Sequence, residues 1–370
     1  MIESLADLPE VAGLFETGGR LVEAVPYGRG HINDTYLATY AREVGTFRLI
    51  HQRINEAVFR DPEGLMENVE RVTAHLGMKL AGRPDAERLA LKLVPTKSGA
   101  AFAQDRLGGY WRSYRFVEGG VTFDTVDGPE RAFEAGRAFG QFQAQLSDLP
   151  GPRLKDTIPN FHDSVKRIEA LESAIETDAC GRVSDAGPEI EFARKWRSLA
   201  GALLELHQAG VVSERVTHND TKVNNLLFDE NTGEALCVVD LDTVMPGLAP
   251  YDFGDLVRTA VSPAAEDERN LSLVEMRMPV YEALLRGYLK GTGSLLNSAE
   301  IECLTLAGKL ITYTIGVRFL TDHIAGDRYF KVHREGHNLD RCRTQFRLAE
   351  SIERKEHELT RLALRIAREA

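Results

Sequence analysis

The chain has 370 residues, of which 43% are hydrophobic and 27% charged, and these proportions exclude an intrinsically disordered or membrane-dominated chain. The formal net charge of −11 argues against a broad nucleic-acid-binding surface, so we expect no nucleic-acid partner. The N-terminus lacks the pattern of a secretory signal, and no continuous run reaches the roughly 18 apolar residues of a membrane span, so we expect a cytoplasmic protein without a membrane partner.

The first third of the chain is predicted to be rich in β-strands. Loosely alternating apolar residues predict strands over residues 21–27, 34–40, 46–54 and 110–117. Apolar residues at helical spacing predict helices over residues 5–15 and 65–76. A glycine-containing turn, residues 28–30, separates the first two strands and predicts a hairpin.

The rest of the chain is predicted to be mostly helical. Helical patterns begin at residue 130 and recur over residues 189–208, 271–290, 298–323 and 345–368. One β-rich interruption lies around residues 226–241. We therefore expect an α+β fold with two lobes: a small β-rich N-terminal lobe, residues 1–118, and a larger, mostly helical C-terminal lobe, residues 119–370.

The most informative stretch combines Asp220, Asn225 and Asp240 around a predicted hairpin. A turn centred near Thr232 and Gly233 would place Asn225 opposite Asp240, because positions paired across a hairpin have a constant sum. Directly opposed residues lie about 4.5–5.5 Å apart at Cβ. One amide oxygen and one carboxylate at that distance could share a Mg²⁺ ion, which prefers oxygen ligands.

Two further residues complete the chemistry of phosphoryl transfer. Asp220 could accept a hydrogen bond from an attacking hydroxyl and orient it toward a γ-phosphate. Lys222 could neutralise charge on the transferring phosphoryl group. The combination of Asp, Asn five positions later and Asp beyond the hairpin is more specific than any one of these residues.

This arrangement resembles the catalytic core of the aminoglycoside phosphotransferase and choline kinase superfamily, whose fold is protein-kinase-like and bilobal. Further motifs resemble the narrower N-acetylhexosamine 1-kinase family, and they are spread over nearly the whole chain. They are GRGHINDTY from residue 28, QRIN from 52, EAGRAFG from 134, THNDTK from 217, DLDTVMPG from 240, DFGD from 252, GVRFL from 316 and GDRYF from 326.

The resemblance implies a kinase that uses ATP and Mg²⁺ to phosphorylate the anomeric hydroxyl of N-acetylglucosamine or N-acetylgalactosamine. Asp220 would be the catalytic base, and Asn225 and Asp240 the metal ligands. Asp252 would anchor the catalytic loop by accepting backbone hydrogen bonds. The sugar pocket would be lined by Asp242, Thr243, Arg318 and Tyr329.

The resemblance also implies the nucleotide site. The turn with Gly28, Gly30 and Ile32 would cover the nucleotide, and the backbone through Val117 and Glu118 would form the hinge that binds adenine.

Protein kinases carry a Lys on the third strand that pairs with a helix Glu, but this chain has no Lys there. Gln52 or Arg53 must take its role, near Glu70 or Glu67. Strand alternation lets only one of the two point inward, and both possibilities stay open.

Three other hypotheses compete with a sugar 1-kinase. A kinase of the same fold could act on an aminoglycoside, choline or another sugar. A nucleotide-binding pseudokinase is suggested by the missing Lys, although Asp220, Asn225 and Asp240 argue against it. A metal-dependent hydrolase using His218 would need more histidines near the site. The sequence carries no signal for an oligomeric interface.

Overall fold

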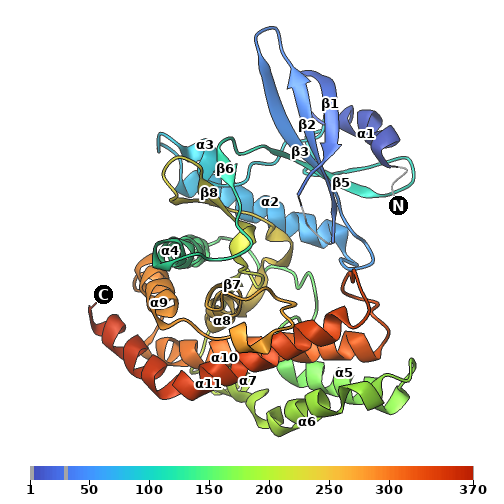
Figure 1. Ribbon diagram of the computed structural model, residues 1–370. Helices are drawn as coiled ribbons and strands as arrows, with labels where there is room; N and C mark the ends of the chain where they lie inside the picture. Colours follow the sequence, from blue (N-terminus) through green and yellow to red (C-terminus); the bar gives the residue numbers. More distant parts are fainter. Residues whose placement is uncertain (1–3, 29–31, 370) are drawn as a thin grey trace. The chain divides into compact units, whose positions relative to one another are not determined.

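The computed structural model describes residues 4–28 and 32–369, with an antiparallel sheet in the N-terminal part and a mostly helical C-terminal part (Figure 1). This is the α+β class expected from the sequence. The chain divides into two compact units. The first consists of residues 1–120, 149–158 and 237–244, and the second of residues 121–148, 159–236 and 245–370.

The first unit is built on an antiparallel sheet whose strand order is β1-β2-β3-β5-β4. Its strands are β1 (Arg20–Pro26), β2 (Asp34–Ala41), β3 (Thr46–Arg53), β4 (Ala103–Gln104) and β5 (Tyr110–Arg115). Alternate residues of β2 are buried, because successive side chains of a strand point to opposite faces. Tyr36, Ala38 and Tyr40 pack on that face in a core that includes residues of α1 (Ser4–Ala12).

Two helices follow in the first unit, α2 (Pro62–Lys79) and the short α3 (Ala86–Leu89). Helix α2 begins where the sequence favours it: Pro62 is at a first helical position, and the Asp61 side chain accepts a hydrogen bond from Gly64 N. The predicted apolar positions, Leu65, Val69, Val72 and Leu76, are all buried.

The second unit holds most of the helices (Figure 1). They are α4 (Pro129–Leu146), α5 (Ser164–Thr177), α6 (Gly187–Lys195), α7 (Ala202–Gln208), α8 (Ala249–Ala260), α9 (Met278–Thr292), α10 (Ser298–Ile324) and α11 (His337–Glu369). Strands β7 (Glu214–Thr217) and β10 (Met245–Leu248) form an antiparallel pair. The remaining short strands of the chain are β6 (Gly120–Val121), β8 (Leu226–Asp229) and β9 (Ala235–Val238).

Helices α4 and α9 pack through glycines on both sides. A Cβ at Gly136 of α4 would lie 2.1 Å from Leu284 O of α9, and a Cβ at Gly287 of α9 would lie 2.0 Å from Phe133 O of α4. Contacts this short are possible only without a side chain. The two helix backbones therefore approach more closely than any larger residue at these positions would allow.

Helix α10 is the core helix of the second unit. Its N-terminus carries a capping box, in which Asn297 Oδ1 accepts from Glu300 N and Glu300 Oε2 accepts from Asn297 N. Within the described residues it is the one helix long and apolar enough to cross a membrane, with a mean hydropathy of 1.3, but 83% of the residues in that window are buried inside the protein. This burial is typical of a core helix.

Three of the predicted helical stretches differ from the structure. The stretch 189–208 is divided into α6 and α7 by a short 3-10 helix, and α9 begins at Met278 rather than residue 271. Pro279 accounts for the second difference, because proline is favoured in the first turn of a helix. The last helix, α11, begins at His337, eight residues before the predicted 345. Helices α5 and α8 were not predicted.

Candidate active site

The catalytic loop, residues 218–222, lies between β7 and the 3-10 helix η3 (Val223–Asn225). Asp252 of α8, which is 1% exposed, anchors its backbone as expected. Asp252 Oδ2 accepts a hydrogen bond from His218 N at 2.9 Å, and Oδ1 accepts one from Asn219 N at 2.7 Å. Burial raises the pKa of Asp252, an effect that His218 and these hydrogen bonds partly offset. The anchor also stabilises the left-handed φ of 64° at Asn219.

Asp220, Lys222 and Asn225 come together in the second unit. Asp220 Oδ2 lies 2.9 Å from Lys222 Nζ and accepts a hydrogen bond from Asn225 Nδ2 at 3.0 Å. Burial by itself raises the pKa of Asp220, but the Lys222 ammonium, with smaller contributions from His218 and Arg258, outweighs it and holds the pKa below its ordinary value. Asp220 is therefore ionised at neutral pH and can act as a hydrogen-bond acceptor or base.

The two predicted metal ligands have the chemistry that Mg²⁺ requires. Asn225 Nδ2 donates to both O and Oδ2 of Asp220, which leaves Oδ1 as the atom that can face a cation. Asp240 belongs to the first unit, is exposed, and precedes the 3-10 helix η4 (Leu241–Thr243) with a left-handed φ of 59°. The described residues contain no group of three or more His, Cys, Asp and Glu side chains able to hold a metal. A magnesium site made of one amide and one carboxylate needs no such group.

The hairpin arithmetic that paired Asn225 with Asp240 is wrong. The turn closes with Asp229 N donating to Glu234 O at 2.9 Å, so its centre lies one residue earlier than predicted. The shift arises because the Asp229 side chain accepts hydrogen bonds from two backbone N–H groups of the turn. Asn225 and Asp240 also lie outside the strands, and the constant-sum rule does not apply to them.

His162 holds the catalytic loop from another side and was missed by the sequence analysis. Its Nε2 donates to Asn219 O at 2.8 Å, and because a carbonyl only accepts, the Nε2 atom carries the proton. Burial lowers the pKa of His162 to about 4, an effect opposed by Asp255, by the hydrogen bond with Asn219 and, least, by Asp220, and reinforced by Arg318. The neutral imidazole therefore lies within electrostatic reach of both Asp220 and Arg318. A lone histidine in a loop offers no spacing by which the sequence could reveal this.

The predicted sugar residues Arg318 and Tyr329 also come together. The Arg318 guanidinium lies 5.0 Å from the ring centroid of Phe161, 5.4 Å from that of Tyr329 and 5.5 Å from that of Phe330. No carboxylate or other acceptor among the described residues pairs with Arg318, so its N–H groups remain available for a ligand. Phe161 is a member of this cluster that the sequence analysis did not find.

The segment that carries Tyr329 is held by Asp322. Asp322 Oδ1 accepts hydrogen bonds from the backbone N atoms of Arg328 and Tyr329, both at 2.8 Å. Asp322 Oδ2 accepts from Phe330 N and Asn338 Nδ2, both at 2.9 Å. The three bonds from backbone N–H groups fix the backbone around Tyr329, and the fourth joins Asp322 to the Asn338 side chain of α11.

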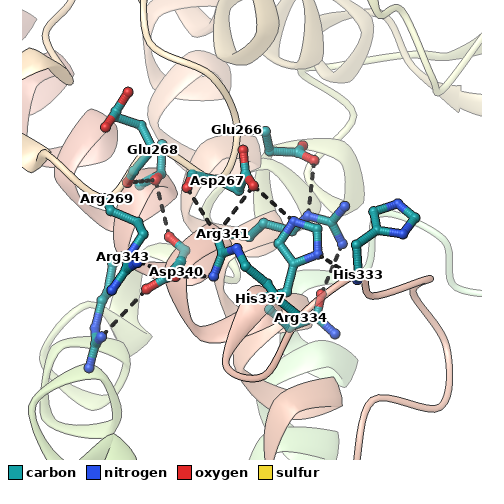
Figure 2. A network of polar contacts seen from close by, with 12 residues as sticks. Glu266, Asp267, Glu268, Arg269, His333, Arg334, His337, Asp340, Arg341 and Arg343 are labelled. Carbon is teal, nitrogen blue, oxygen red and sulfur yellow. Dashed lines mark hydrogen bonds and ion pairs between the residues drawn. The ribbon is translucent and has the colours of Figure 1, made fainter.

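A charged network fastens the residues that follow this segment to the loop between α8 and α9 (Figure 2). Asp267 lies 3.2 Å from Arg334 Nη2 and 3.0 Å from His337 Nε2. Arg334 also pairs with Asp340, and Arg341 lies 3.7 Å from a carboxylate oxygen of the same loop. Because these charges are partly exposed, each pair alone contributes little, and the network as a whole holds the two segments together.

In the first unit, Gln52 and Arg53 point to opposite sides of the sheet. Gln52 Oε1 accepts hydrogen bonds from Arg112 Nε at 2.9 Å and Nη2 at 2.6 Å. Arg53 faces Asp105 instead, at 3.9 Å. Arg112 Nη2 also lies 2.5 Å from Asp242 Oδ1, so Gln52 is the residue that joins the polar cluster beside Asp242. Arg112 is a further residue that the sequence analysis missed.

The other two predicted sugar residues are buried in the first unit. Asp242 is 2% exposed and Thr243 9% exposed. Asp242 Oδ2 accepts a hydrogen bond from Asn33 Nδ2 at 2.6 Å, whereas Oδ1 forms the ion pair with Arg112 without a hydrogen bond of ordinary geometry. Their contact with a sugar stays a prediction.

The structure brings neither predicted glutamate of α2 to strand β3. Glu70 is exposed, and Glu67 is exposed and pairs with a lysine at 2.9 Å. The α2 side chain that meets the polar cluster is Met66, whose Sδ lies 3.9 Å from Arg112 Nη1. The physical reason is helical periodicity: the apolar spacing that buries one face of α2 turns both glutamates toward solvent.

The predicted nucleotide turn is described in part. Gly28 has a φ of 78°, a left-handed conformation that glycine adopts without steric cost. Ile32 is half-buried, and its carbonyl accepts a hydrogen bond from Asn55 Nδ2 at 3.0 Å. Gly30 lies outside the described residues.

The predicted hinge ends the sheet of the first unit. Val117 is buried, whereas the Glu118 side chain is exposed and hydrogen-bonds Arg48. The Glu118 carbonyl accepts a hydrogen bond from Arg88 Nε at 2.9 Å. Binding of adenine by this backbone stays a prediction.

Comparison with known proteins gives consistent matches. A sequence profile described as the phosphotransferase enzyme family matches residues 23–295. An aminoglycoside phosphotransferase from Alicyclobacillus acidocaldarius is similar in structure, with a TM-score of 0.57 and 13% identity over 96% of both chains. A choline kinase from Cryptosporidium parvum has a TM-score of 0.55 and 15% identity over 93% of this chain and 92% of that one. A spectinomycin phosphotransferase, solved with ADP and spectinomycin, has a TM-score of 0.53 and 11% identity over 94% of this chain and 98% of its own.

At these identities, the similarity concerns the fold. It confirms the predicted protein-kinase-like, bilobal α+β class, with an antiparallel sheet in the N-terminal part and a mostly helical C-terminal part.

Proposed function

Because this chain belongs to the phosphotransferase enzyme family, we propose that it transfers the γ-phosphoryl group of ATP to the anomeric hydroxyl of an N-acetylhexosamine. The product would be the sugar 1-phosphate, and Mg²⁺ would accompany the nucleotide. The ADP complex of the similar spectinomycin phosphotransferase supports the use of a nucleotide.

The observation that carries the proposal is the state of Asp220. Its carboxylate is held by Lys222 and Asn225, and its pKa lies below the ordinary value. An ionised carboxylate on an anchored loop can accept the proton of a hydroxyl and orient the oxygen for in-line attack. Transfer would be direct, without a covalent phosphoenzyme.

Other residues of the chain would assist this step. Asn225 Oδ1 and Asp240 would hold Mg²⁺, which when bound neutralises phosphate charge. Lys222 would stabilise charge on the transferring group. His162 and Asp252 would hold the loop that carries Asp220.

The choice of an N-acetylhexosamine rests on the Arg318 cluster. A guanidinium without a protein acceptor can donate to hydroxyl or amide oxygens of a sugar. Tyr329 is 46% exposed, and its ring can pack on an apolar sugar face. Asp242 and Thr243 belong to the same proposal by resemblance alone.

The test is ADP release with ATP and Mg²⁺ against N-acetylglucosamine, N-acetylgalactosamine, glucose, galactose, choline and kanamycin, with phosphorus NMR of any product. We expect a phosphorus signal coupled to the anomeric proton only with the N-acetylhexosamines. D220A and D240A should abolish turnover, while E230A, an exposed acid of the nearby turn, should retain it.

Each other outcome rejects a defined part of the proposal. Turnover of choline or kanamycin alone would reject the sugar. Near wild-type kcat in a folded D220A would reject the base. Nucleotide binding without any turnover would favour a pseudokinase.

A further inference from the structure

The first unit contains a buried cation that no predicted role includes. Arg112 projects from β5 and is 1% exposed, and an arginine is almost never that buried without a partner. Its partner is the carboxylate of Asp242, at 2.5 Å. Gln52 Oε1 accepts two further hydrogen bonds from the same guanidinium.

The location of this cation matters because of what β3 lacks. Gln52 is one of the two candidates for the third-strand position where the kinase pattern has Lys, and it lies directly opposite Arg112 in the β3–β5 register. The charge missing from β3 is therefore supplied by the neighbouring strand. It contacts the segment around Asp242 instead of a glutamate of α2.

The contacts of Arg112 continue into the segment that carries Asp240. Asp242 lies within η4, two residues after Asp240, and its second carboxylate oxygen is held by Asn33 at the start of β2. Burial lowers the pKa of Arg112, but the carboxylates of Asp242 and Asp240 more than offset this and raise it. Arg112 is thus within electrostatic reach of both acids.

We propose that Arg112 is a positioning residue for the nucleotide-bound metal: by holding Asp242 it fixes the turn from which Asp240 reaches Mg²⁺. The inference rests on the proposed function for the role of Asp240. Arg112 itself is too buried to touch phosphate, so it acts through Asp242. The left-handed conformation of Asp240 is strained for a residue other than glycine, so surrounding contacts must hold the turn in place.

The experiment measures ADP binding by calorimetry, once with MgCl₂ and once with a chelator. The dissociation constant measured with chelator, divided by that measured with MgCl₂, gives a ratio that reports how strongly Mg²⁺ strengthens ADP binding. R112M should lower this ratio by about tenfold, the usual cost of losing support for a metal ligand, and leave metal-free ADP binding unchanged. R112K should restore part of the lost Mg²⁺ effect, and in D240A ADP should bind equally well with and without Mg²⁺.

Two variants serve as controls. R115M removes an exposed arginine of the same strand and should keep the wild-type ratio. R112M/D242N removes both buried charges together, so neither remains without a partner. This variant should recover the stability that R112M loses, while its ratio stays low.

The proposal would be overturned if folded R112M kept the wild-type ratio. It would also be overturned if R112M weakened metal-free ADP binding as much as it weakens ADP binding with Mg²⁺. If R112M does not fold, a wild-type ratio in R112M/D242N overturns it. The proposal would also be overturned if Mg²⁺ did not strengthen ADP binding to the wild-type protein. If the sugars are not phosphorylated but Mg²⁺ still strengthens ADP binding, only the proposed substrate is rejected.

Discussion

The glycine contacts between α4 and α9 lead to a prediction in which one substitution has opposite effects at two sites. G136A adds a Cβ 2.1 Å from Leu284 O, where ordinary contact begins at 3.4 Å, so the helices must separate by 3.4 − 2.1 = 1.3 Å. Overpacking of this kind costs about 1–3 kcal/mol. Because the obstacle is backbone of a second helix and cannot rotate away, we expect about 3 kcal/mol, at the upper end of that range.

The matched control is G77A, on the exposed side of α2. Nothing lies within 4 Å of a Cβ at Gly77. Alanine is favoured over glycine in a helix interior by about 1 kcal/mol. G77A should therefore stabilise the first unit by about 0.5–1 kcal/mol, and the two variants should differ in sign.

The two tryptophans of the chain allow each unit to be followed separately. Trp111 is buried in the first unit and Trp196 in the second. Urea unfolding of a W111F background reports the second unit through Trp196, and a W196F background reports the first through Trp111. If G136A leaves the Trp196 midpoint unchanged or raises it, the inferred steric conflict between α4 and α9 is refuted.

Two further predictions follow from the shifted pKa values. K222M removes the ammonium that lowers the pKa of Asp220, so the acidic limb of the kcat/KM profile should move to higher pH. An acidic limb at the wild-type position would show that Lys222 does not control the pKa of the base. The second concerns His51, whose buried ring has a pKa lowered to about 4. Its neutral form favours folding fully above pH 6.5, the value of an unfolded histidine, and this contribution of about 3 kcal/mol is lost as the pH falls from 6.5 to 4. H51Q should flatten that part of the pH dependence of urea unfolding read at Trp111, and an unchanged slope would contradict the assignment.

The elements predicted well are those that bury one face. Residues 34–40 and 46–54 alternate because one side of the sheet packs on a core and the other does not. Helix α2 was recovered near its true ends for the same kind of reason, a regular apolar pattern on one face. Helix α10 is buried on nearly every side, and its long apolar composition revealed it instead. Such patterns are local, so a sequence alone can reveal them.

Helix α8 was missed, and its buried residues include three charged side chains. Asp252, Asp255 and Arg258 lie inside the second unit, where an amphipathic helix would have apolar residues. Asp252 binds the catalytic loop and Arg258 pairs with Asp255 at 2.8 Å. A helix whose buried residues include charged side chains lacks the all-apolar buried face by which a helix is most easily predicted.

Among the candidate site residues, those that are close in sequence also lie close together in the structure. Asp220, Lys222 and Asn225 fall within one loop and one turn, so their spacing carries their geometry. His162 and Arg112 contact residues far along the chain, Asn219 and Asp242 respectively. No local pattern connects such partners, and only the fold brings them together.

The interrupted make-up of the first unit has a consequence for protein synthesis. Its sheet is complete by residue 120, but residues 237–244 join the same unit much later. At translation rates of about 5–20 residues per second, the nascent sheet waits roughly 6–24 s for Asp242. Until then Arg112 has no carboxylate to neutralise it, and burying it alone is unfavourable. The part of the protein made first is therefore expected to stay incomplete until residue 244 has been made, and to depend on chaperones while it waits.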